Sequence, residues 1–510
     1  KDCILMGLNA AFRQLVRIQD IPAATLLISI PSSRTANRRR GGDYLFNLSH
    51  QISKNSKYPI SKLLIAPKVP LLIQKSNVQD QSGLSARERM QNMDSAIYVN
   101  PRIAAKLKNL HTTVLLMDDV ITSGATLKSA ISALEASKIT VIGEEVHAPY
   151  NRPPLSKEVL AKEVTHEAVA FKLRAQVEDV IWNLGDPATS VDLEKQVVTT
   201  VSGKTFEYDG LVIASGLRPR VLDLPNGKVS GRHTVRTLDD AIGLRAELVP
   251  GAKVVVAGAG FIGCEVAATA RGLGCEVTNV AIDSFPMIRP LGEELAAELQ
   301  RRHVAHGVRF RLGHGIKDLT GTDSLSGVIL DDGELLEATV LVEAISSHCN
   351  VEWLANTNLD ISNGVLTDSA LRAVTTDGDS VEGVYVVGDL ARFANPLFDD
   401  EPRRIEHWNI PTETGKRVGA VLSAYLSQAD NFAELAAQPF APLPTFWSDQ
   451  YDMKIQGFGM PGLADRYELV DGALAGELVM AYFRNDALIG VVGIGMTAEV
   501  MKYRKQLLGT

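Results

Sequence analysis

The chain has 510 residues, of which 45% are hydrophobic and 22% charged, and its formal net charge at pH 7 is −8. This length accommodates three or four domains with separate cores, and the composition is ordinary for a soluble globular protein. No apolar run reaches the ~18–20 residues of a membrane span, no signal peptide opens the chain, and the four cysteines lack CxxC or zinc-ligand spacing, so we expect a cytoplasmic protein without membrane contact, structural metal or dithiol centre.

Charge is unevenly distributed along the chain. Residues 1–140 hold 19 Lys and Arg against 9 Asp and Glu, a net charge of +10, which leaves −18 for the remainder. A basic N-terminal part suits a phosphorylated or nucleic-acid ligand. An ordinarily solvated surface is the alternative.

The N-terminal third contains a phosphate-binding pattern. Residues 28–31 are predicted to form a buried strand, and Val114–Met117 a second one that runs into two carboxylates and a Thr-Ser-Gly-Ala-Thr turn. The carboxylates could hold ribose hydroxyls and Mg²⁺, while the turn opens a helix over residues 127–136 and offers backbone N–H groups to a phosphate. The loop residues are Asp118, Asp119, Thr122, Ser123, Gly124, Ala125 and Thr126.

This loop resembles the phosphoribosyl-pyrophosphate (PRPP) loop of ComF-type phosphoribosyltransferases. The resemblance implies a type I phosphoribosyltransferase-like doubly wound sheet over residues 1–142, with Mg²⁺ and PRPP as its ligands. An ordinary Rossmann-like turn is the alternative for the loop, and a solvated charge run for the arginines at 38–40.

The next strand, Thr140–Gly143, ends in two acidic residues and leads to a proline-rich segment. That segment, residues 149–160, reads Pro-Tyr-Asn-Arg-Pro-Pro-Leu-Ser-Lys-Glu-Val-Leu. With the acidic pair before it, the segment contains the candidate residues Glu144, Glu145, Arg152 and Lys157, for which the reductase resemblance given below implies a cofactor-binding role.

A complete dinucleotide-binding fingerprint follows. The valine-rich strand Lys253–Ala257 leads into Gly258, Gly260 and Gly263, which open a helix over residues 264–273, and Glu276–Ala281 forms the second strand. The first glycine makes the tight turn, the second lets the backbone meet a pyrophosphate, and the third lets the helix pack on the strand. Ala281 stands where an acidic residue is expected, with Asp283 two positions on and no Arg or Lys at that point, so NADH is favoured and NADPH stays open.

Four further segments carry candidate residues. Residues 208–220 form a strand and turn that end in Arg220, and residues 384–389 form a buried strand that ends in Gly388 and Asp389. A third segment, residues 404–408, ends in Trp408, and a fourth, residues 446–451, has the sequence Phe-Trp-Ser-Asp-Gln-Tyr. A helix-cap role is the alternative for the aspartate, and core packing for the tryptophans.

In their order, these segments resemble the FAD-dependent ferredoxin and rhodocoxin reductases over residues 139–510, without the first glycine-rich loop of that family. The resemblance implies FAD and NADH as cofactors, a ferredoxin-like iron–sulfur protein as electron acceptor, and Lys157 near flavin N5, paired with Glu265. The implied domains are phosphoribosyltransferase-like (1–142), FAD-binding (140–235 and 365–435), NAD(P)-binding (236–364) and a small α+β C-terminal domain (436–510), an α/β architecture throughout the larger parts.

Three hypotheses remain open from the sequence. The leading one is an FAD-dependent NAD(P)H oxidoreductase, in which the strand, loop and helix over 114–136 replace the missing first βα unit of the FAD domain. The second is a phosphoribosyltransferase fused to a flavin-free reductase remnant, and the third an inactive joining of two truncated genes.

Overall fold

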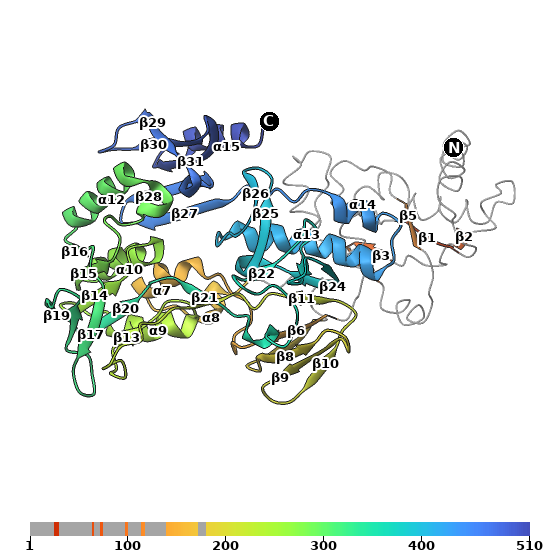
Figure 1. The fold of residues 1–510 in the computed structure, drawn as a ribbon, viewed down its shortest axis with the longest axis horizontal. Coiled ribbons are helices and arrows are strands. Elements are labelled where there is room, and N and C mark those ends of the chain that lie inside the picture. The colour runs from red at the N-terminus through yellow and green to blue at the C-terminus, as the bar shows by residue number, and fades with distance from the viewer. Residues whose placement is uncertain are drawn as a thin grey trace. The chain divides into compact units, whose positions relative to one another are not determined.

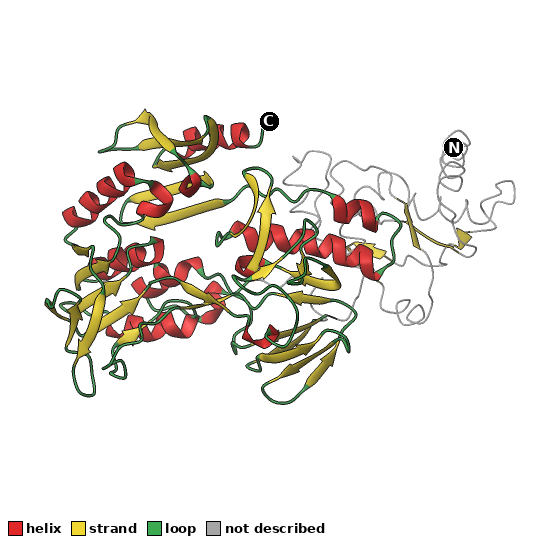
Figure 2. Cartoon of the chain, viewed as in Figure 1, coloured by secondary structure: helices red, strands yellow, loops and turns green. Residues whose placement is uncertain are grey.

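A computed structural model describes residues 139–171 and 180–509 in full, together with the backbone of five strands within residues 25–117. The chain forms two compact units, Lys1–Val141 with Lys172–Trp182 and Ile142–Phe171 with Asn183–Thr510 (Figures 1 and 2). None of the helices among these residues is long and apolar enough to cross a membrane.

The first unit contains two small sheets. The parallel sheet has the order β2-β1-β5, with β1 (Thr25–Ser29) between β2 (Leu64–Ile65) and β5 (Val114–Met117). β3 (Leu72–Gln74) and β4 (Ile97–Val99) form an antiparallel pair. The strand predicted at 114–117 is therefore present, but three parallel strands are common to many α/β domains and do not distinguish a phosphoribosyltransferase. The loop at 118–126 and the helix at 127–136 lie outside the described residues.

The part predicted to bind flavin consists of strands from two separate stretches of the chain. β11 pairs in parallel with β24, whose run Val384–Val386 is fully buried around Tyr385. The helix α13 packs on β24, so the buried strand delivers its last residues to the edge of this sheet. The elements are β6 (Thr140–Gly143), η3 (Pro153–Ser156), α7 (Glu158–Ala161), α8 (His166–Val169), β7 (Ile181–Leu184), β8 (Ala188–Asp192), β9 (Val197–Thr200), β10 (Thr205–Glu207), β11 (Leu211–Ile213), β22 (Val365–Leu366), β23 (Arg372–Val374), β24 (Ser380–Val386), η6 (Gly388–Leu390), β25 (Ala391–Asn395), β26 (Asp399–Arg404), α13 (Asn409–Leu426) and α14 (Phe432–Ala437).

The fingerprint strand lies at the centre of a five-stranded parallel sheet of order β13-β20-β14-β15-β16. A central parallel strand is covered on both faces, which explains the uninterrupted valines of β14. Its elements are β13 (Arg232–His233), α9 (Leu238–Glu247), β14 (Lys253–Ala257), α10 (Phe261–Gly272), β15 (Glu276–Ala281), α11 (Ile288–Leu291), α12 (Glu293–Ala305), β16 (Arg309–Leu312), β17 (Ile316–Thr320), β18 (Gly327–Leu330), β19 (Leu335–Glu337) and β20 (Val340–Glu343), and β12 (Leu217–Pro219), β21 (Ser347–Cys349) and η5 (Glu352–Leu354) connect it to the flavin part.

The C-terminal part is an antiparallel sheet of order β27-β28-β31-β30-β29, with the helix α15 against β31. Along β27 burial alternates, so that Phe446, Ser448 and Gln450 face inward while Trp447 and Asp449 are exposed. Its core is continuous with residues of α10 and α12. The elements are β27 (Thr445–Gln450), β28 (Met453–Gly459), η7 (Pro461–Leu463), β29 (Arg466–Gly472), β30 (Leu478–Arg484), β31 (Ala487–Ile494) and α15 (Thr497–Leu507).

Candidate functional site

The three fingerprint glycines have different physical roles. Gly258 has φ +104°, and a Cβ there would lie 2.2 Å from the carbonyl oxygen of Ala344. A Cβ on Gly263 would lie 2.1 Å from the carbonyl oxygen of Gly258. Gly260 differs, because nothing lies within 4 Å of the position where its Cβ would be. It is also the N-cap of α10, without a side chain to cap the helix. The open space at this helix N-terminus fits a pyrophosphate.

The end of β15 is the expected place for the adenosine ribose. Asp283 lies just past this end, and its carboxylate forms an ion pair with Arg289 at 2.9 Å. Beside it, the backbone N–H groups of Gly313 and His314 donate to the carbonyls of Asp283 and Ala281. The region therefore has a carboxylate, as the sequence analysis expected, but an arginine already neutralises it.

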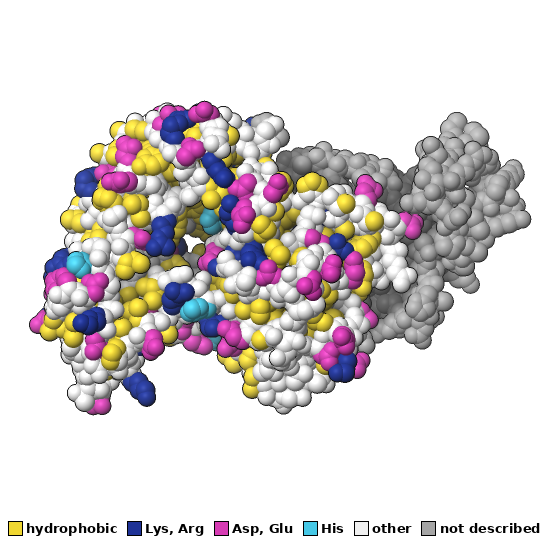
Figure 3. All heavy atoms as spheres, in the orientation of Figure 1, with side chains coloured by type: hydrophobic (Ala, Val, Ile, Leu, Met, Phe, Trp, Pro, Cys, Tyr) yellow, Lys and Arg dark blue, Asp and Glu magenta, His cyan; other side chains and the backbone are white. Residues whose placement is uncertain are grey.

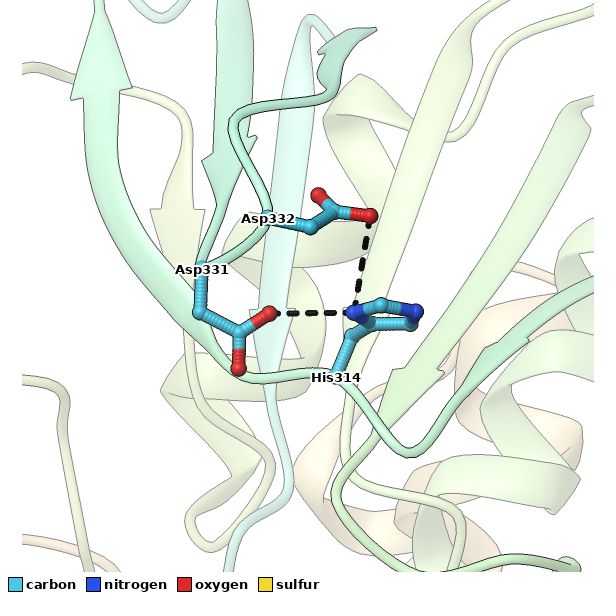
Figure 4. A group of neighbouring side chains, drawn as sticks. All are labelled: His314, Asp331 and Asp332. Atoms are coloured by element: carbon cyan, nitrogen blue, oxygen red, sulfur yellow. Dashed lines mark hydrogen bonds and ion pairs between the residues drawn. The ribbon is translucent and has the colours of Figure 1, made fainter.

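A compact acidic group lies next to this strand end. His314 Nδ1 is 3.0 Å from Asp331 Oδ1 and 3.6 Å from Asp332 Oδ2 (Figure 4). The Gly315 N–H and His314 both bond to Asp331, and together they lower the pKa of its carboxyl. These hydrogen bonds account for the cluster, so its exposed position carries no argument for a metal ion.

The proline-rich segment binds to itself and to the strand before it. Glu145 accepts from Tyr150 Oη and pairs with Arg152, whose Nη1 also donates to the carbonyl of Arg236 at 2.7 Å. Burial, and the hydrogen bond to Glu145, raise the pKa of Tyr150 to about 12, so it stays a donor. Glu144 is exposed. Of the two acidic residues, Glu145 is thus the one that the fold fixes in place.

Asp389 lies at the start of η6, directly after β24. The preceding Gly388 has φ +74° and donates its N–H to Thr414 Oγ1 of α13 at 3.0 Å. The carboxylate of Asp389 is 3.7 Å from Arg236 Nη2, an ion pair that is too long for a hydrogen bond. Burial raises the pKa of Asp389 and lowers the pKa of Arg236, which also feels the charge of Arg152.

These two half-satisfied charges test whether the site fits the flavin cofactor that the sequence implies. These side chains are half-buried, and a charge partly removed from water is costly when its hydrogen bonds are incomplete, so such groups suit a ligand that completes them. Hydroxyl groups of a ribityl chain suit the carboxylate, and a phosphate suits the guanidinium. The described residues therefore fit this part of FAD. The sequence analysis missed Arg236, although it directly precedes the capping box of Thr237 and Asp240, a recognisable helix start.

Lys157 and Glu265 meet between the proline-rich segment and the helix α10. Lys157 Nζ lies 2.6 Å from Glu265 Oε2, with side-chain exposures of 14% and 6%. The expected ion pair is present, and it joins the loop predicted to contact flavin to the helix α10, whose N-cap is Gly260. Figure 3 shows Lys, Arg and His side chains around a hollow in the middle of this unit.

The remaining predicted residues are exposed. Arg220 donates its backbone N–H to the carbonyl of Ser346, but its exposed side chain forms no hydrogen bond or ion pair among the residues that the structure describes. The indole of Trp408 is 46% exposed, donates to Asn151 Oδ1 at 3.3 Å and lies 5.6 Å from the ring of Trp447. The PRPP-loop residues named above fall in the undescribed stretch 118–138.

Comparison with known proteins places the chain among flavin-dependent reductases. Residues 122–415 match the pyridine nucleotide-disulphide oxidoreductase family, and residues 445–509 match the reductase C-terminal family. Rhodocoxin reductase of Rhodococcus erythropolis is 32% identical over 72% of this chain and 83% of its own length. The ferredoxin–NAD(+) reductase component of the anthranilate 1,2-dioxygenase system of Burkholderia cepacia is 33% identical over 67% of this chain and 82% of its own length.

Solved structures agree with these matches. A ferredoxin reductase from Rhodopseudomonas palustris superposes with a TM-score of 0.66 at 30% identity, covering 75% of this chain and 91% of its own. Putidaredoxin reductase in its covalent complex with putidaredoxin gives the same TM-score at 26% identity, covering 74% and 88%.

Proposed function

The chain belongs to the pyridine nucleotide-disulphide oxidoreductase family, as an NAD(P)H-dependent flavoprotein oxidoreductase, and we propose that it carries electrons from NADH through FAD to a ferredoxin-like iron–sulfur protein. The buried Lys157–Glu265 pair carries this proposal, because it joins the flavin loop to the helix that opens at the NAD glycines. FAD, when bound, accepts hydride from NADH and passes electrons on one at a time.

The chain's own residues bind and orient the two cofactors. We assign Asp389 to the ribityl hydroxyls, Arg236 and Arg152 to the flavin phosphates, and the N-terminus of α10 at Gly260 to the NADH pyrophosphate. Lys157 is assigned to the flavin ring, with Glu265 holding its ammonium group in place. Burial lessens the screening of this pair by water, but its two charges largely cancel at a distance, so the Lys157 ammonium acts mainly on a ligand in direct contact with it.

NADH suits the adenosine end of the site better than NADPH. Asp331 and Asp332 place two carboxylates beside the end of β15, and Arg289, which could otherwise receive a phosphate, is already paired with Asp283. A 2′-phosphate would bring further negative charge to this place, which costs free energy. A 2′-hydroxyl could donate to a carboxylate instead.

The exposed tryptophans supply a surface for the acceptor. Trp408 and Trp447 lie side by side, and Trp408 is bonded to Asn151 of the flavin loop. Exposed aromatic pairs are favoured at the centres of protein interfaces. The relatives named above include a putidaredoxin complex and a dioxygenase-system component, which supports an iron–sulfur protein as the partner.

The N-terminal region is proposed to replace the first βα unit of the FAD domain. The family match starts at residue 122, the first residue of the Thr122–Thr126 motif, and not at the strand Thr140–Gly143. The ComF-type phosphoribosyltransferase alternative rests on the motif alone. If PRPP with Mg²⁺ displaces flavin, the two ligands share one cradle; independent binding would contradict this idea.

Reduction of a [2Fe–2S] ferredoxin by NADH, with purified FAD-loaded protein as catalyst, tests the electron route. We expect the ferredoxin's visible bands to bleach only when all components are present, and Lys157→Met to slow the reaction. Lys162→Met, an exposed lysine five residues on, serves as the matched control and keeps the wild-type rate. Reduction of ferricyanide without reduction of any ferredoxin would contradict the proposed partner class.

A further inference from the structure

The carboxylate of Glu265 is buried and receives hydrogen bonds from three residues in two separate segments. Ser156 Oγ at 2.5 Å and Lys157 Nζ at 2.6 Å donate to Oε2. Ser448 Oγ of the C-terminal strand β27 donates to Oε1 at 2.6 Å. The C-terminal domain therefore contacts directly the residue that holds the flavin-facing lysine.

The contact continues as a chain into the C-terminal domain and back to α12. Gln450 Nε2 donates to Ser448 Oγ at 2.9 Å, and Gln450 Oε1 lies 2.7 Å from His303 Nε2. Ser448, Gln450 and His303 are all fully buried. Each inward position follows from the alternation along β27, which lies against α10 (Figure 1).

The hydrogen bonds of this series, from His303 through Gln450 and Ser448 to Glu265, have a defined donor-to-acceptor direction. An ionised carboxylate accepts only, so the Ser448 hydroxyl must donate to Glu265, and its remaining lone pairs take the Gln450 amide. The Gln450 carbonyl then accepts from His303, which fixes the histidine proton on Nε2. Burial lowers the pKa of His303 and keeps the ring neutral, and its Nδ1 has no partner among the described residues. The hydrogen bonds from His303 to Gln450, from Gln450 to Ser448 and from Ser448 to Glu265 thus all point toward Glu265, while the Gln450 amide also donates to Met287 Sδ at 3.6 Å.

We propose that Ser448 and Gln450, supported by His303, are positioning residues that hold the Glu265 carboxylate aimed at Lys157. They contact neither cofactor, and act through the carboxylate alone. This inference rests on the proposed function only for its effect on the rate of flavin reduction. Whether the hydrogen-bond series orients Lys157 can be measured without flavin. It also gives the C-terminal domain a part in the chemistry besides contact with an acceptor.

The direct readout is the accessibility of the Lys157 amine. Purified flavin-free protein is treated briefly with acetic anhydride, and acetylation of Lys157 is followed by peptide mass spectrometry. Ser448→Ala removes the donor to Oε1 of Glu265, so we expect the acetylation rate of Lys157 to rise about tenfold. In Ser448→Thr, which keeps the hydroxyl, the acetylation rate should stay near that of the wild type. Asp449→Asn, on the exposed face of the same strand, is the matched control and stays unchanged.

Gln450→Glu tests the direction of the chain with almost no change in shape. A carboxylate at position 450 would accept the hydrogen bond of the Ser448 hydroxyl in place of Glu265. Glu265 would then lose that donor, although the strand remains intact. We expect Lys157 labelling to rise as in Ser448→Ala. In FAD-loaded protein, the rate of flavin reduction by NADH should fall about tenfold with an unchanged KM for NADH.

The two readouts separate this inference from the proposed function. Wild-type labelling of Lys157 in both Ser448→Ala and Gln450→Glu would overturn the positioning role, whatever the enzyme does. Faster labelling of Lys157 in these variants, in a protein that never retains flavin, would support the positioning role of the hydrogen-bond series and refute the proposed function. If labelling of Lys157 rises but flavin reduction by NADH keeps its wild-type rate, the hydrogen-bond series positions Lys157 without affecting the reaction. That outcome would contradict the predicted fall in the rate of flavin reduction.

Discussion

Gly260→Asp should separate stability from cofactor binding with opposite signs. Gly260 has extended backbone at the N-cap of α10, with open space around the position of a Cβ. An aspartate there caps the helix and places an anion at its positive end, so the fold should become more stable by about 0.5–1 kcal/mol. The same carboxylate would occupy the pyrophosphate position.

The expected loss of NADH binding follows from the charges. Two unit charges 4 Å apart interact by about 4 kcal/mol at an effective dielectric constant of 20, so repulsion of the pyrophosphate should lower kcat/KM for NADH by at least about 100-fold. Stopped-flow reduction by NADH and thermal unfolding of the same samples measure the two effects. Gly260→Asn, which caps the helix without the charge, should lose less activity.

Gly263→Ala is the steric counterpart on the same helix. Its Cβ would meet the Gly258 carbonyl at 2.1 Å, so the helix must move away from the strand and the melting temperature should fall.

Wild-type kcat/KM for NADH in Gly260→Asp would refute the assignment of this loop to the pyrophosphate.

Three more substitutions test separate parts of the site. Asp389→Asn should stabilise the flavin-free protein, because burial raises the pKa of this carboxyl and penalises its ionised form, yet weaken retention of FAD through desalting; equal retention would contradict the ribityl assignment. His407 is expected to make the protein acid-sensitive: burial lowers its pKa from 6.5 to about 4, so stability present above pH 6.5 is lost as the pH falls toward 4, by at most about 3 kcal/mol, and His407→Phe should flatten the pH profile of unfolding in that window. Trp447→Ala should raise the KM for a ferredoxin without changing the reduction of ferricyanide by NADH, and a rise for both acceptors would place the indole's effect elsewhere.

Local patterns in the sequence predicted the secondary structure near the site well. β14 and β15 have the expected bounds, and α10 begins three residues before the predicted helix because the glycine loop itself supplies the first turn. Buried parallel strands leave a continuous run of β-branched residues, which is a strong local signal.

Contacts between distant segments were harder to predict. Arg236 and Asp389 are 153 positions apart, and the hydrogen bond from Ser448 to Glu265 spans 183. No periodicity reports such pairs, because folding, not local propensity, brings them together. The alternation along β27 does predict that Phe446, Ser448 and Gln450 share a face, and a buried serine and glutamine on one face require partners. That rule would have indicated a polar network, although not its end at Glu265.

Anaerobic addition of NADH to the purified, FAD-loaded chain tests the central claim most directly. The account predicts that flavin stays bound through desalting and that NADH bleaches its visible absorbance band within the time of a catalytic turnover, with NADPH much slower. A chain that retains no flavin, or a bound flavin whose spectrum NADH leaves unchanged, would contradict it.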